Sequence, residues 1–440
     1  MKELKKFYIR TYGCQMNEMD TEVMAGILTQ RGLTQTEHEE SADLLIYNTC
    51  SIRDLAERKV MGKLGKLGRQ KRENRVIGVT GCMANSKKES LFQKLPHVGF
   101  VLGTNNIHDL NAVLDEVLHT GEQTLKTDDE FTQELDYSVA QRKDKYKAYV
   151  PIIRGCDKYC TYCVVPYTRG PEVSRHPDHI LEECRKLVDQ GYKEITLLGQ
   201  NVNSYGKDCP EWNTAFHDLL YQIDKIPGVG WVRFLTSHPV DITPQLMEAI
   251  RDLRSLCEHV HFPLQAGSDR ILRKMHRIYK KAEYMEKVQL LRELVPNVAL
   301  GTDMIVGFPT ETEEEFMETY EAMKEIEYAN AFLYTFSPRK GTPARRWADD
   351  IPEEVKKDRH ARLLNLHSEI ASRLMREMLG QEVEVLVERR SKDARYLKGL
   401  TRCWRSVLFE GEDSLIGTMQ QATLHSCNHQ TFIGQLTIAE

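Results

Sequence analysis

The chain has 440 residues, of which 41% are hydrophobic and 28% are charged, and its formal net charge is -5. This composition is that of a globular protein large enough for several domains, and it excludes a chain that is basic throughout. The N-terminus lacks an apolar signal segment and no apolar run has membrane-spanning length, so we expect a cytoplasmic protein without membrane contact. In a reducing compartment the eleven cysteines are expected to be metal ligands, reactive thiols or packing residues.

The first part of the chain alternates between short apolar runs and helical or polar stretches. The runs predicted to be strands are Phe7–Thr11, Ala42–Tyr47 and Val76–Thr80. This alternation is typical of βαβ units, so residues 1–120 are predicted to form an open parallel α/β sheet. Residues 121–145 are polar without a clear period, and they are interpreted as a linker or surface strap.

A cysteine directly follows each of these strands: Cys14, Cys50 and Cys82. The carboxyl ends of parallel strands share one edge of a sheet and neighbouring strands lie about 4.8 Å apart, so the three thiols can converge. Single cysteines are often only buried packing residues. Three at equivalent places, each among polar residues, favour a metal site, and three thiolates leave one iron of a cubane cluster open.

The central part resumes the alternation over a longer stretch. The predicted strands are Ala148–Ile153, Glu194–Leu198, Trp231–Thr236, His259–Leu264, Gly301–Val306 and Ala331–Phe336. Six strand–helix repeats in roughly 200 residues predict a partial (β/α)6 barrel, because a full barrel of this type has eight. The core is assigned to residues 146–375.

Three further cysteines, Cys156, Cys160 and Cys163, lie within eight residues after the first of these strands. Thiolates are the usual ligands of iron–sulfur clusters, and this run again supplies three ligands. A structural zinc site is the alternative, but such sites have four closed ligands, usually in two pairs, and no second pair is present. The run therefore favours a cluster with one iron open to a small molecule.

The C-terminal part begins with a predicted helix from Pro352 to about Gly380. Alternating apolar residues and glycines from Gln381 onward then predict a small antiparallel β-barrel or sandwich, assigned to residues 378–440. Basic and aromatic residues in this module are candidate RNA contacts, since cations neutralise phosphate and aromatic rings stack on unpaired bases. They are Arg389, Arg390, Lys392, Arg395, Lys398, Arg402, Trp404 and Arg405. A solvated charged face is the alternative interpretation.

With both cysteine sets placed, the whole chain resembles the radical-SAM (S-adenosylmethionine) methylthiotransferases. The stretches Tyr12-Gly13-Cys14-Gln15-Met16-Asn17 and Asn48-Thr49-Cys50-Ser51-Ile52-Arg53 resemble the MiaB branch of that family, which modifies tRNA. The resemblance implies a methylthiotransferase N-terminal domain at 1–120, a radical-SAM core at 146–375 and a TRAM domain at 378–440.

The resemblance also implies an activity. We expect a transferase that methylthiolates C2 of N6-isopentenyladenosine at position 37 of tRNA, with two 4Fe-4S clusters as cofactors. One SAM would supply the methyl group and another a 5′-deoxyadenosyl radical. The implied partners are a tRNA anticodon stem-loop carrying isopentenyladenosine, an electron donor and a sulfur or cluster carrier, and the default state is a monomer. Methylthiolation of another adenosine or of a ribosomal-protein aspartate, and a non-catalytic iron–sulfur RNA-binding protein, stay open as alternatives.

SAM contacts are expected at the carboxyl ends of the core strands, where barrel enzymes build their sites. The residues that the resemblance assigns to SAM are Tyr162, Gln200, Asn201, Ser237, Gln265 and Gly307. Each of them is alternatively ordinary loop structure. No catalytic side chain is expected beyond the cluster ligands.

Overall fold

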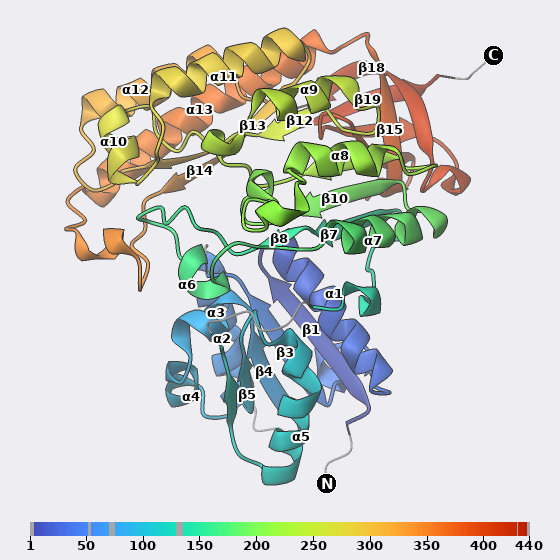
Figure 1. Ribbon diagram of the computed structural model, residues 1–440, viewed down its shortest axis with the longest axis vertical. Coiled ribbons are helices and arrows are strands. Elements are labelled where there is room, and N and C mark those ends of the chain that lie inside the picture. Colours follow the sequence, from blue (N-terminus) through green and yellow to red (C-terminus); the bar gives the residue numbers. More distant parts are fainter. Residues whose placement is uncertain (1–3, 52–53, 70–74, 129–134, 429, 438–440) are drawn as a thin grey trace.

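The computed structural model describes residues 4–51, 54–69, 75–128, 135–428 and 430–437. An N-terminal α/β domain, a central α/β core and a C-terminal β-barrel follow one another along the chain (Figure 1). None of the helices in these ranges combines the length and the apolar composition needed to cross a membrane.

The N-terminal domain is built on a six-stranded sheet in the order β2-β1-β3-β4-β5-β6, in which every neighbouring pair is parallel. The strands are β1 (Lys6–Tyr12), β2 (Thr34–Gln35), β3 (Leu44–Thr49), β4 (Val76–Thr80), β5 (Phe100–Leu102) and β6 (Thr124–Lys126). The predicted open parallel sheet is confirmed, although β3 starts and ends two residues later than expected.

Helices cover both faces of this sheet. They are α1 (Gln15–Gln30), α2 (Asp54–Arg69), α3 (Cys82–Lys87), α4 (Ser90–Lys94) and α5 (Leu110–Thr120). Apolar side chains of α1 and α5, such as Met19 and Leu114, pack in one core cluster. Those of α2, α3 and α4, such as Leu64 and Met83, pack in another cluster on the opposite face. Burial on both faces explains why β3 and β4 are apolar at almost every position.

The segment between this domain and the core is more ordered than a linker. Its strand β6, which the sequence analysis did not anticipate, pairs with β5 at the sheet edge. Further along, Arg142 donates to Glu22 of α1 over 3.2 Å and to Glu183 of the core over 2.5 Å. The segment therefore fastens the two domains to each other.

The core has its six principal strands in two parallel three-stranded sheets, β11-β10-β7 and β12-β13-β14, joined by a parallel bridge between Val232 and Leu256. The strands are β7 (Lys147–Pro151), β10 (Glu194–Leu198), β11 (Trp231–Phe234), β12 (His259–His261), β13 (Ala299–Val306) and β14 (Asn330–Thr335). The helices between them are α7 (Pro177–Asp189), α8 (Phe216–Asp224), α9 (Pro244–Asp252), α10 (Asp269–Lys274), α11 (Lys281–Leu294) and α12 (Glu313–Ile326). This is the expected partial barrel.

One predicted strand is divided in two. The run expected at 148–153 ends as β7 at Pro151, and a separate strand β8 (Ile153–Arg154) pairs antiparallel with β9 (Val173–Ser174). Proline lacks the N–H that a continuing ladder needs. The β8–β9 pair closes the base of a loop that contains the second cysteine set and the short helix α6 (Val165–Arg169).

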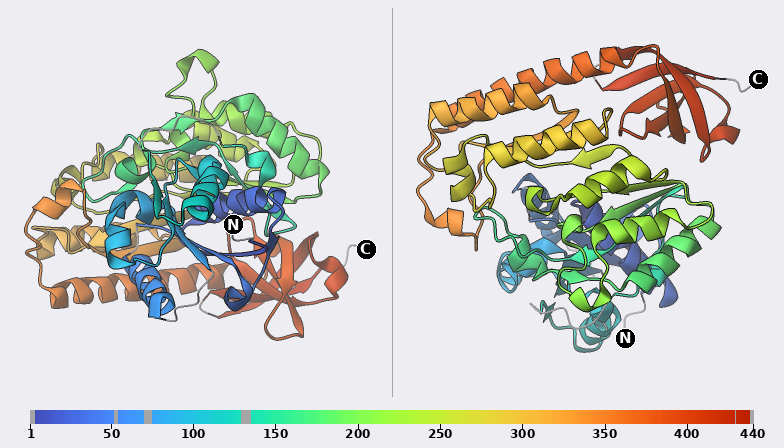
Figure 2. Two further views of the ribbon diagram at one scale, coloured as in Figure 1. Left: turned by 90° about the horizontal axis from the view of Figure 1, so that it is seen from below. Right: turned by 45° about the horizontal axis from the view of Figure 1, so that its top comes forward.

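Helix α13 (Glu353–Glu377) extends along the core to the C-terminal barrel (Figure 2). The closed barrel has the order β15-β16-β17-β19-β18, and all its pairs are antiparallel except β17 with β19. Its strands are β15 (Glu382–Arg390), β16 (Tyr396–Thr401), β17 (Ser406–Glu410), β18 (Met419–Asn428) and β19 (Thr431–Leu436). The buried residue Met375 of α13 contributes to the barrel's own apolar core.

The barrel rests against the amino ends of the core strands. Trp231, the first residue of β11, donates to Glu384 of β15 over 2.9 Å. Lys147, the first residue of β7, pairs with Glu388 over 2.6 Å. The opposite edge of the core, formed by the carboxyl ends of its strands, is therefore left to the second cysteine set and its surroundings.

Candidate metal centres

The first cysteine set lies at one edge of the N-terminal sheet. Cys14 follows β1 and precedes the first turn of α1, Cys50 follows β3, and Cys82 is the first residue of α3 after β4. Because β1, β3 and β4 are adjacent, the three thiols leave the sheet at the same edge, as the sequence predicts. Gly81 has φ 87°, and a Cβ there would lie 2.4 Å from Asn48 Oδ1, so glycine is required before Cys82.

These thiols influence one another. A hydrogen bond with Cys50 lowers the pKa of Cys14 to about 6, against the opposing effect of burial, and the positive charge of Arg169 lowers it further. Arg169 interacts electrostatically with Cys82 as well. A thiol whose pKa is depressed near neutrality is readily a thiolate, which is the form that binds metals. The set thus has the donor chemistry of a metal–sulfur centre.

Three buried hydroxyls beside these cysteines have no hydrogen-bond partner among the residues that the structure describes: Thr49 Oγ1, Ser51 Oγ and Thr80 Oγ1. Buried polar atoms in native proteins nearly always have a partner, and an orphan indicates a bound group. The residues present therefore fit a centre that accepts hydrogen bonds, as the sulfurs of an iron–sulfur cluster do.

The second cysteine set lies in the loop closed by β8 and β9. Gly155 before it has φ 75°, and a Cβ there would lie 1.7 Å from Pro171 O, so only glycine allows the two arms of the loop to approach. Burial raises the pKa of Cys156 to about 12. The pKa of Cys163 is also raised, first by burial and next by the charge of Cys160. Thiolates this close in a buried loop need cationic compensation, which a metal centre supplies.

Within the ranges that the structure describes, no three His, Cys, Asp or Glu side chains are gathered tightly enough to hold a single metal ion. The thiolate ligands of a cubane cluster bind different irons, whereas all ligands of a zinc ion touch one atom.

A buried ion pair links the two cysteine sets. Arg169 of α6 comes six residues after Cys163, and its Nη2 donates to Asp20 Oδ2 of α1 over 2.8 Å. Arg154, which directly precedes Gly155, approaches the other oxygen of Asp20 at 3.5 Å. Burial disfavours the charged form of Arg169, but Asp20, Cys82 and Cys14 together raise its pKa well above the usual value.

A second buried arginine serves the core cysteines. Arg277 Nη1 donates to Cys160 Sγ over 3.4 Å, and its Nη2 donates to Pro263 O over 3.1 Å. The sequence analysis missed Arg169, Arg277 and Asp20. A charged residue in an otherwise apolar stretch, as Arg169 is after Val164, Val165 and Pro166, is the one local signal that marks such a position.

The predicted SAM contacts surround this loop at the carboxyl edge of the core. Tyr162 meets Phe308 edge-on with ring centroids 6.4 Å apart, and Phe308 directly follows Gly307. Gln200 Oε1 accepts from Gly155 N over 2.6 Å, so its carbonyl oxygen is engaged in holding the cysteine loop. Gln265 is buried with φ 71° and pairs through its backbone with Met304 of β13.

Asn201 and Ser237 carry the clearest signs of a ligand. Asn201 Nδ2 donates to Asp241 Oδ2 over 2.8 Å, and because a carboxylate only accepts, the amide oxygen must face the other way. Asn201 Oδ1 and Ser237 Oγ are both buried, and neither has a hydrogen-bond partner within the described part of the chain. His238 Nε2 is orphaned in the same way. These atoms fit a polar ligand such as the amino and carboxylate groups of SAM.

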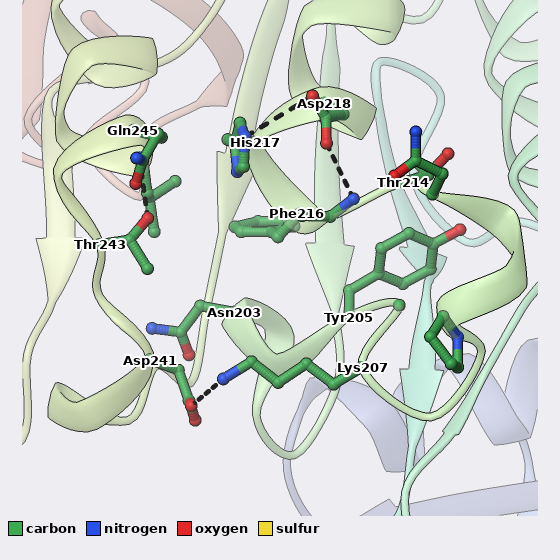
Figure 3. A pocket seen from close by; sticks show the side chains of 15 residues that line it. Asn203, Tyr205, Lys207, Thr214, Phe216, His217, Asp218, Asp241, Thr243 and Gln245 are labelled. Atoms are coloured by element: carbon green, nitrogen blue, oxygen red, sulfur yellow. Dashed lines mark hydrogen bonds and ion pairs between the residues drawn. The ribbon is translucent and has the colours of Figure 1, made fainter.

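Asp241 holds several of these parts together. Its carboxylate pairs with Lys158 of the cysteine loop over 2.8 Å and with Lys207 over 2.5 Å. Figure 3 shows Lys207 and Asp241 meeting at the side of a pocket of about 290 Å³ that also includes Asn203 and His217. The carboxylate therefore connects the cysteine loop, Asn201 and the outer pocket.

The turn after β13 is fixed from below by Glu311. Its Oε2 accepts from Gly307 N over 2.7 Å and from Arg359 Nη1 of α13 over 2.8 Å. Burial nevertheless raises the pKa of Glu311 to about 7. The backbone at Gly307 has φ 68° and leaves no room for a Cβ beside Lys356.

Three of the predicted RNA contacts instead belong to the junction between the barrel and the core. Arg405 is 7% exposed and donates to Ala329 O over 2.8 Å. Arg402 pairs with Glu258 over 2.8 Å, and Trp404 stacks edge-on against His259. These three side chains contact groups of the core, so their predicted contact with RNA stays a prediction.

The other basic residues of the C-terminal barrel differ in their ion pairs and in their exposure to solvent. Arg390 pairs with Asp413 over 2.5 Å and Arg395 pairs with Asp393 over 2.7 Å. Arg389 and Lys392 are exposed, and Lys398 is half-buried. These last three are the strongest remaining candidates for phosphate contact.

Comparisons with known proteins match two parts of the chain to protein families. Residues 6–103 match the model of a family described as Uncharacterized protein family UPF0004, and residues 150–323 match the Radical SAM superfamily. A tRNA-2-methylthio-N(6)-dimethylallyladenosine synthase of Protochlamydia amoebophila is 70% identical over 99% of this chain and 97% of its own. The protein of that name from Clostridium botulinum is 45% identical over 98% of this chain and 96% of its own.

Solved structures resemble the fold at low sequence identity. The radical S-adenosylmethionine methyltransferase TsrM from Kitasatospora setae, with cobalamin and a [4Fe-4S] cluster bound, has a TM-score of 0.58 at 12% identity. The match covers 78% of this chain and 74% of TsrM. The cobalamin-dependent radical enzyme OxsB has a TM-score of 0.52 at 12% identity, over 84% of this chain and 56% of OxsB.

Proposed function

Because the chain belongs to the family of the tRNA-2-methylthio-N(6)-dimethylallyladenosine synthases, we propose that it methylthiolates C2 of N6-isopentenyladenosine at position 37 of tRNA. It is a radical-SAM tRNA methylthiotransferase that uses an iron–sulfur cluster and SAM. The anticodon loop is single-stranded, so the target base is accessible without opening a duplex.

Cys156, Cys160 and Cys163 would hold the cluster that binds SAM. Cys14, Cys50 and Cys82 would hold a second cluster that carries the sulfur. When bound, the first cluster and SAM supply a 5′-deoxyadenosyl radical able to remove hydrogen from an unactivated carbon, and the second supplies the methylthio group. The depressed pKa of Cys14 and the orphaned hydroxyls around Cys50 support the second assignment.

The chain's own side chains bind and orient. Asn201 Oδ1, turned away from Asp241, would accept from the SAM ammonium, and Ser237 Oγ would donate to its carboxylate or ribose. Tyr162 would lie beside the adenine together with the turn at Gly307. Arg277 keeps the Cys160 sulfur in a buried, charge-compensated place that excludes water.

The substrate would bind through the anticodon stem-loop. Arg389 and Lys392 on the barrel are exposed and Lys398 is half-buried, so their positive charges are accessible to its phosphates. An electron donor and a sulfur or cluster carrier complete the proposed partners, and a monomer supplies all the residues named.

The observation that carries this proposal is the junction itself. Two cysteine triplets from different domains are tied together by the buried pair of Arg169 and Asp20. A radical source and a sulfur source must act on the same base, so their ligand sets must be neighbours.

The test uses a bacterial strain whose own synthase gene is deleted. Wild-type chain, the triple variant C156A/C160A/C163A and the triple variant C14A/C50A/C82A are each supplied on a plasmid, and tRNA nucleosides are measured by mass spectrometry. Wild type should restore 2-methylthio-isopentenyladenosine and both variants should fail. Unrestored nucleoside with wild type, in cells where the chain is full-length and iron-loaded, would contradict the proposed substrate.

The purified proteins separate the two cysteine sets. With SAM and a reductant, C14A/C50A/C82A should still form 5′-deoxyadenosine, and C156A/C160A/C163A should form none. Absence of 5′-deoxyadenosine from iron-loaded wild type would favour a non-catalytic RNA-binding protein. Modification of a ribosomal-protein aspartate or of an unprenylated adenosine in place of isopentenyladenosine would identify another substrate of the same chemistry.

A further inference from the structure

Arg169 belongs to the core by sequence but lies among residues of the N-terminal domain. It ends α6, which packs against α3, the helix that begins with Cys82 (Figure 1). Its residue is 3% exposed, and the carboxylate of Asp20 that it meets is 1% exposed. A cation this deeply buried is costly unless each of its N–H groups has a partner.

Of the two terminal nitrogens of the guanidinium, only Nη2 has a hydrogen-bond partner among the described atoms. Nη2 donates to Asp20 Oδ2 over 2.8 Å, which fixes the orientation of the planar group. Nη1 is buried and has no hydrogen-bond partner among the described atoms. After Asp20, the negative groups that act most strongly on this arginine are Cys82 and Cys14.

We propose that Arg169 Nη1 donates a hydrogen bond to a sulfur of the metal–sulfur centre held by Cys14, Cys50 and Cys82. The core thereby contributes a donor to the sulfur-carrying centre of the other domain. This inference rests on the proposed second cluster, and it adds a residue that lies outside the N-terminal domain and that no cysteine pattern indicates.

The interaction has an electrochemical consequence. Hydrogen bonds to cluster sulfurs, and a nearby positive charge, stabilise the reduced and more negative form of a cluster and so raise its reduction potential. Asp20 offsets part of the charge but leaves the Nη1 hydrogen bond unaffected. The donor is present only while the core is docked, so the potential of the N-terminal centre depends on the state of the junction.

The test uses full-length chain in the C156A/C160A/C163A background, so that the N-terminal centre is the only cluster. Arg169→Gln removes the cation and shortens the donor, and Arg169→Lys keeps the charge with a single nitrogen. Iron and sulfide are quantified, and the reduction potential is read from a redox titration followed by electron paramagnetic resonance. Arg169→Gln should lower the reduction equilibrium constant at least tenfold, which is about 59 mV for one electron. Arg169→Lys should lower the same equilibrium constant by a smaller factor.

Arg154→Gln is the matched control, because Arg154 is also buried and approaches the same carboxylate of Asp20. It should remove one contact of Asp20 while the shorter Arg169–Asp20 hydrogen bond keeps the core docked, and so should not produce the tenfold shift. An equal shift in Arg154→Gln and Arg169→Gln, or unchanged potentials in both Arg169 variants with the cluster retained, would overturn the inference. If Arg169→Gln cannot hold iron, the reduction potential of Arg169→Lys tests the inference instead, and an unchanged potential in that variant would overturn it. If the C156A/C160A/C163A protein with Arg169 intact binds no iron, that result would instead count against the proposed second cluster.

Discussion

Arg277 and Cys160 meet over 3.4 Å, with the guanidinium donating to the sulfur, although they are 117 residues apart. Both side chains are nearly inaccessible to solvent. The contact gives the core cysteines a buried cation, as Arg169 gives one to the N-terminal cysteines. Each cysteine set thus has its own arginine.

Replacing Arg277 with Met should destabilise the chain. The change removes a charged hydrogen-bond donor from Pro263 O and from the Cys160 sulfur, and the loss of such hydrogen bonds costs about 2 kcal/mol. Urea unfolding of the cluster-free protein measures this free energy. Arg273→Met, an exposed arginine four residues earlier, should change it by less than about 0.5 kcal/mol. Equal effects would show that the buried contacts of Arg277 add nothing.

Ser237→Ala should have opposite effects on stability and on SAM binding. Because Ser237 Oγ is buried and has no partner in the ranges that the structure describes, removing it should stabilise the SAM-free protein by about 1 kcal/mol. The same change should weaken SAM binding about tenfold if that hydroxyl contacts SAM. Thermal unfolding and equilibrium binding to the cluster-loaded enzyme measure the two quantities.

Ser255→Ala is the control for this change. Ser255 Oγ already donates to Asp224 over 2.6 Å, so its loss should lower stability and leave SAM affinity unchanged. Unaltered SAM affinity in Ser237→Ala would remove Ser237 from the proposed contacts.

The triple variant R389A/K392A/K398A should bind the anticodon stem-loop more weakly and with a smaller dependence on salt. Each lost phosphate contact should reduce the slope of log affinity against log salt by up to about 0.9. Binding titrations at several salt concentrations measure the slope, and thermal unfolding should be unchanged. Arg405→Ala should have the opposite pattern of effects. It should lower the unfolding temperature, because Ala329 O loses its buried donor, and leave the salt dependence of binding unchanged. An unchanged slope in the triple variant would place the RNA elsewhere.

Glu311 should make stability depend on pH near neutrality. Its pKa is raised from 4.5 to about 7 in the folded chain, so the folded state binds more protons than the unfolded state between these values. Stability from this group is therefore fully present below about pH 4.5 and is lost as pH rises to about 7, by up to about 3 kcal/mol. Unfolding free energies from pH 5 to 8 should decline less in Glu311→Gln than in wild type. Glu321→Gln, at an exposed position of the following helix α12, should keep the wild-type profile, and identical profiles for all three proteins would contradict the assignment.

The cysteine sets could be predicted from sequence because their signals are local. Cys156, Cys160 and Cys163 are fixed by spacing, and Cys14, Cys50 and Cys82 are fixed by their places after strands. The pair of Arg169 and Asp20 joins residues 149 apart, and no periodicity marks either residue. Such pairs depend on how the domains dock, which short-range patterns do not encode.

Three basic and aromatic residues of the barrel have partners in the core that the sequence does not reveal. Arg402, Trp404 and Arg405 have the residue types of an RNA surface, yet they satisfy Glu258, His259 and Ala329 O of the core. A cation beside an aromatic ring has the same appearance in sequence whether its partner is a phosphate or a neighbouring domain. Strand β6 escaped prediction for a related reason, because its three residues become a strand only by pairing with β5.

Helix α13 is a continuous helical connection between the core and the barrel. Its 25 residues span roughly 37 Å, and the stretch from Arg359, beside the turn at Gly307, to Met375, inside the barrel, spans roughly 24 Å of this. The helix therefore sets the separation between the barrel and the carboxyl edge of the core. Adding or removing one helical turn would move the barrel by about 5.4 Å along the helix axis relative to the cysteine loop of the core.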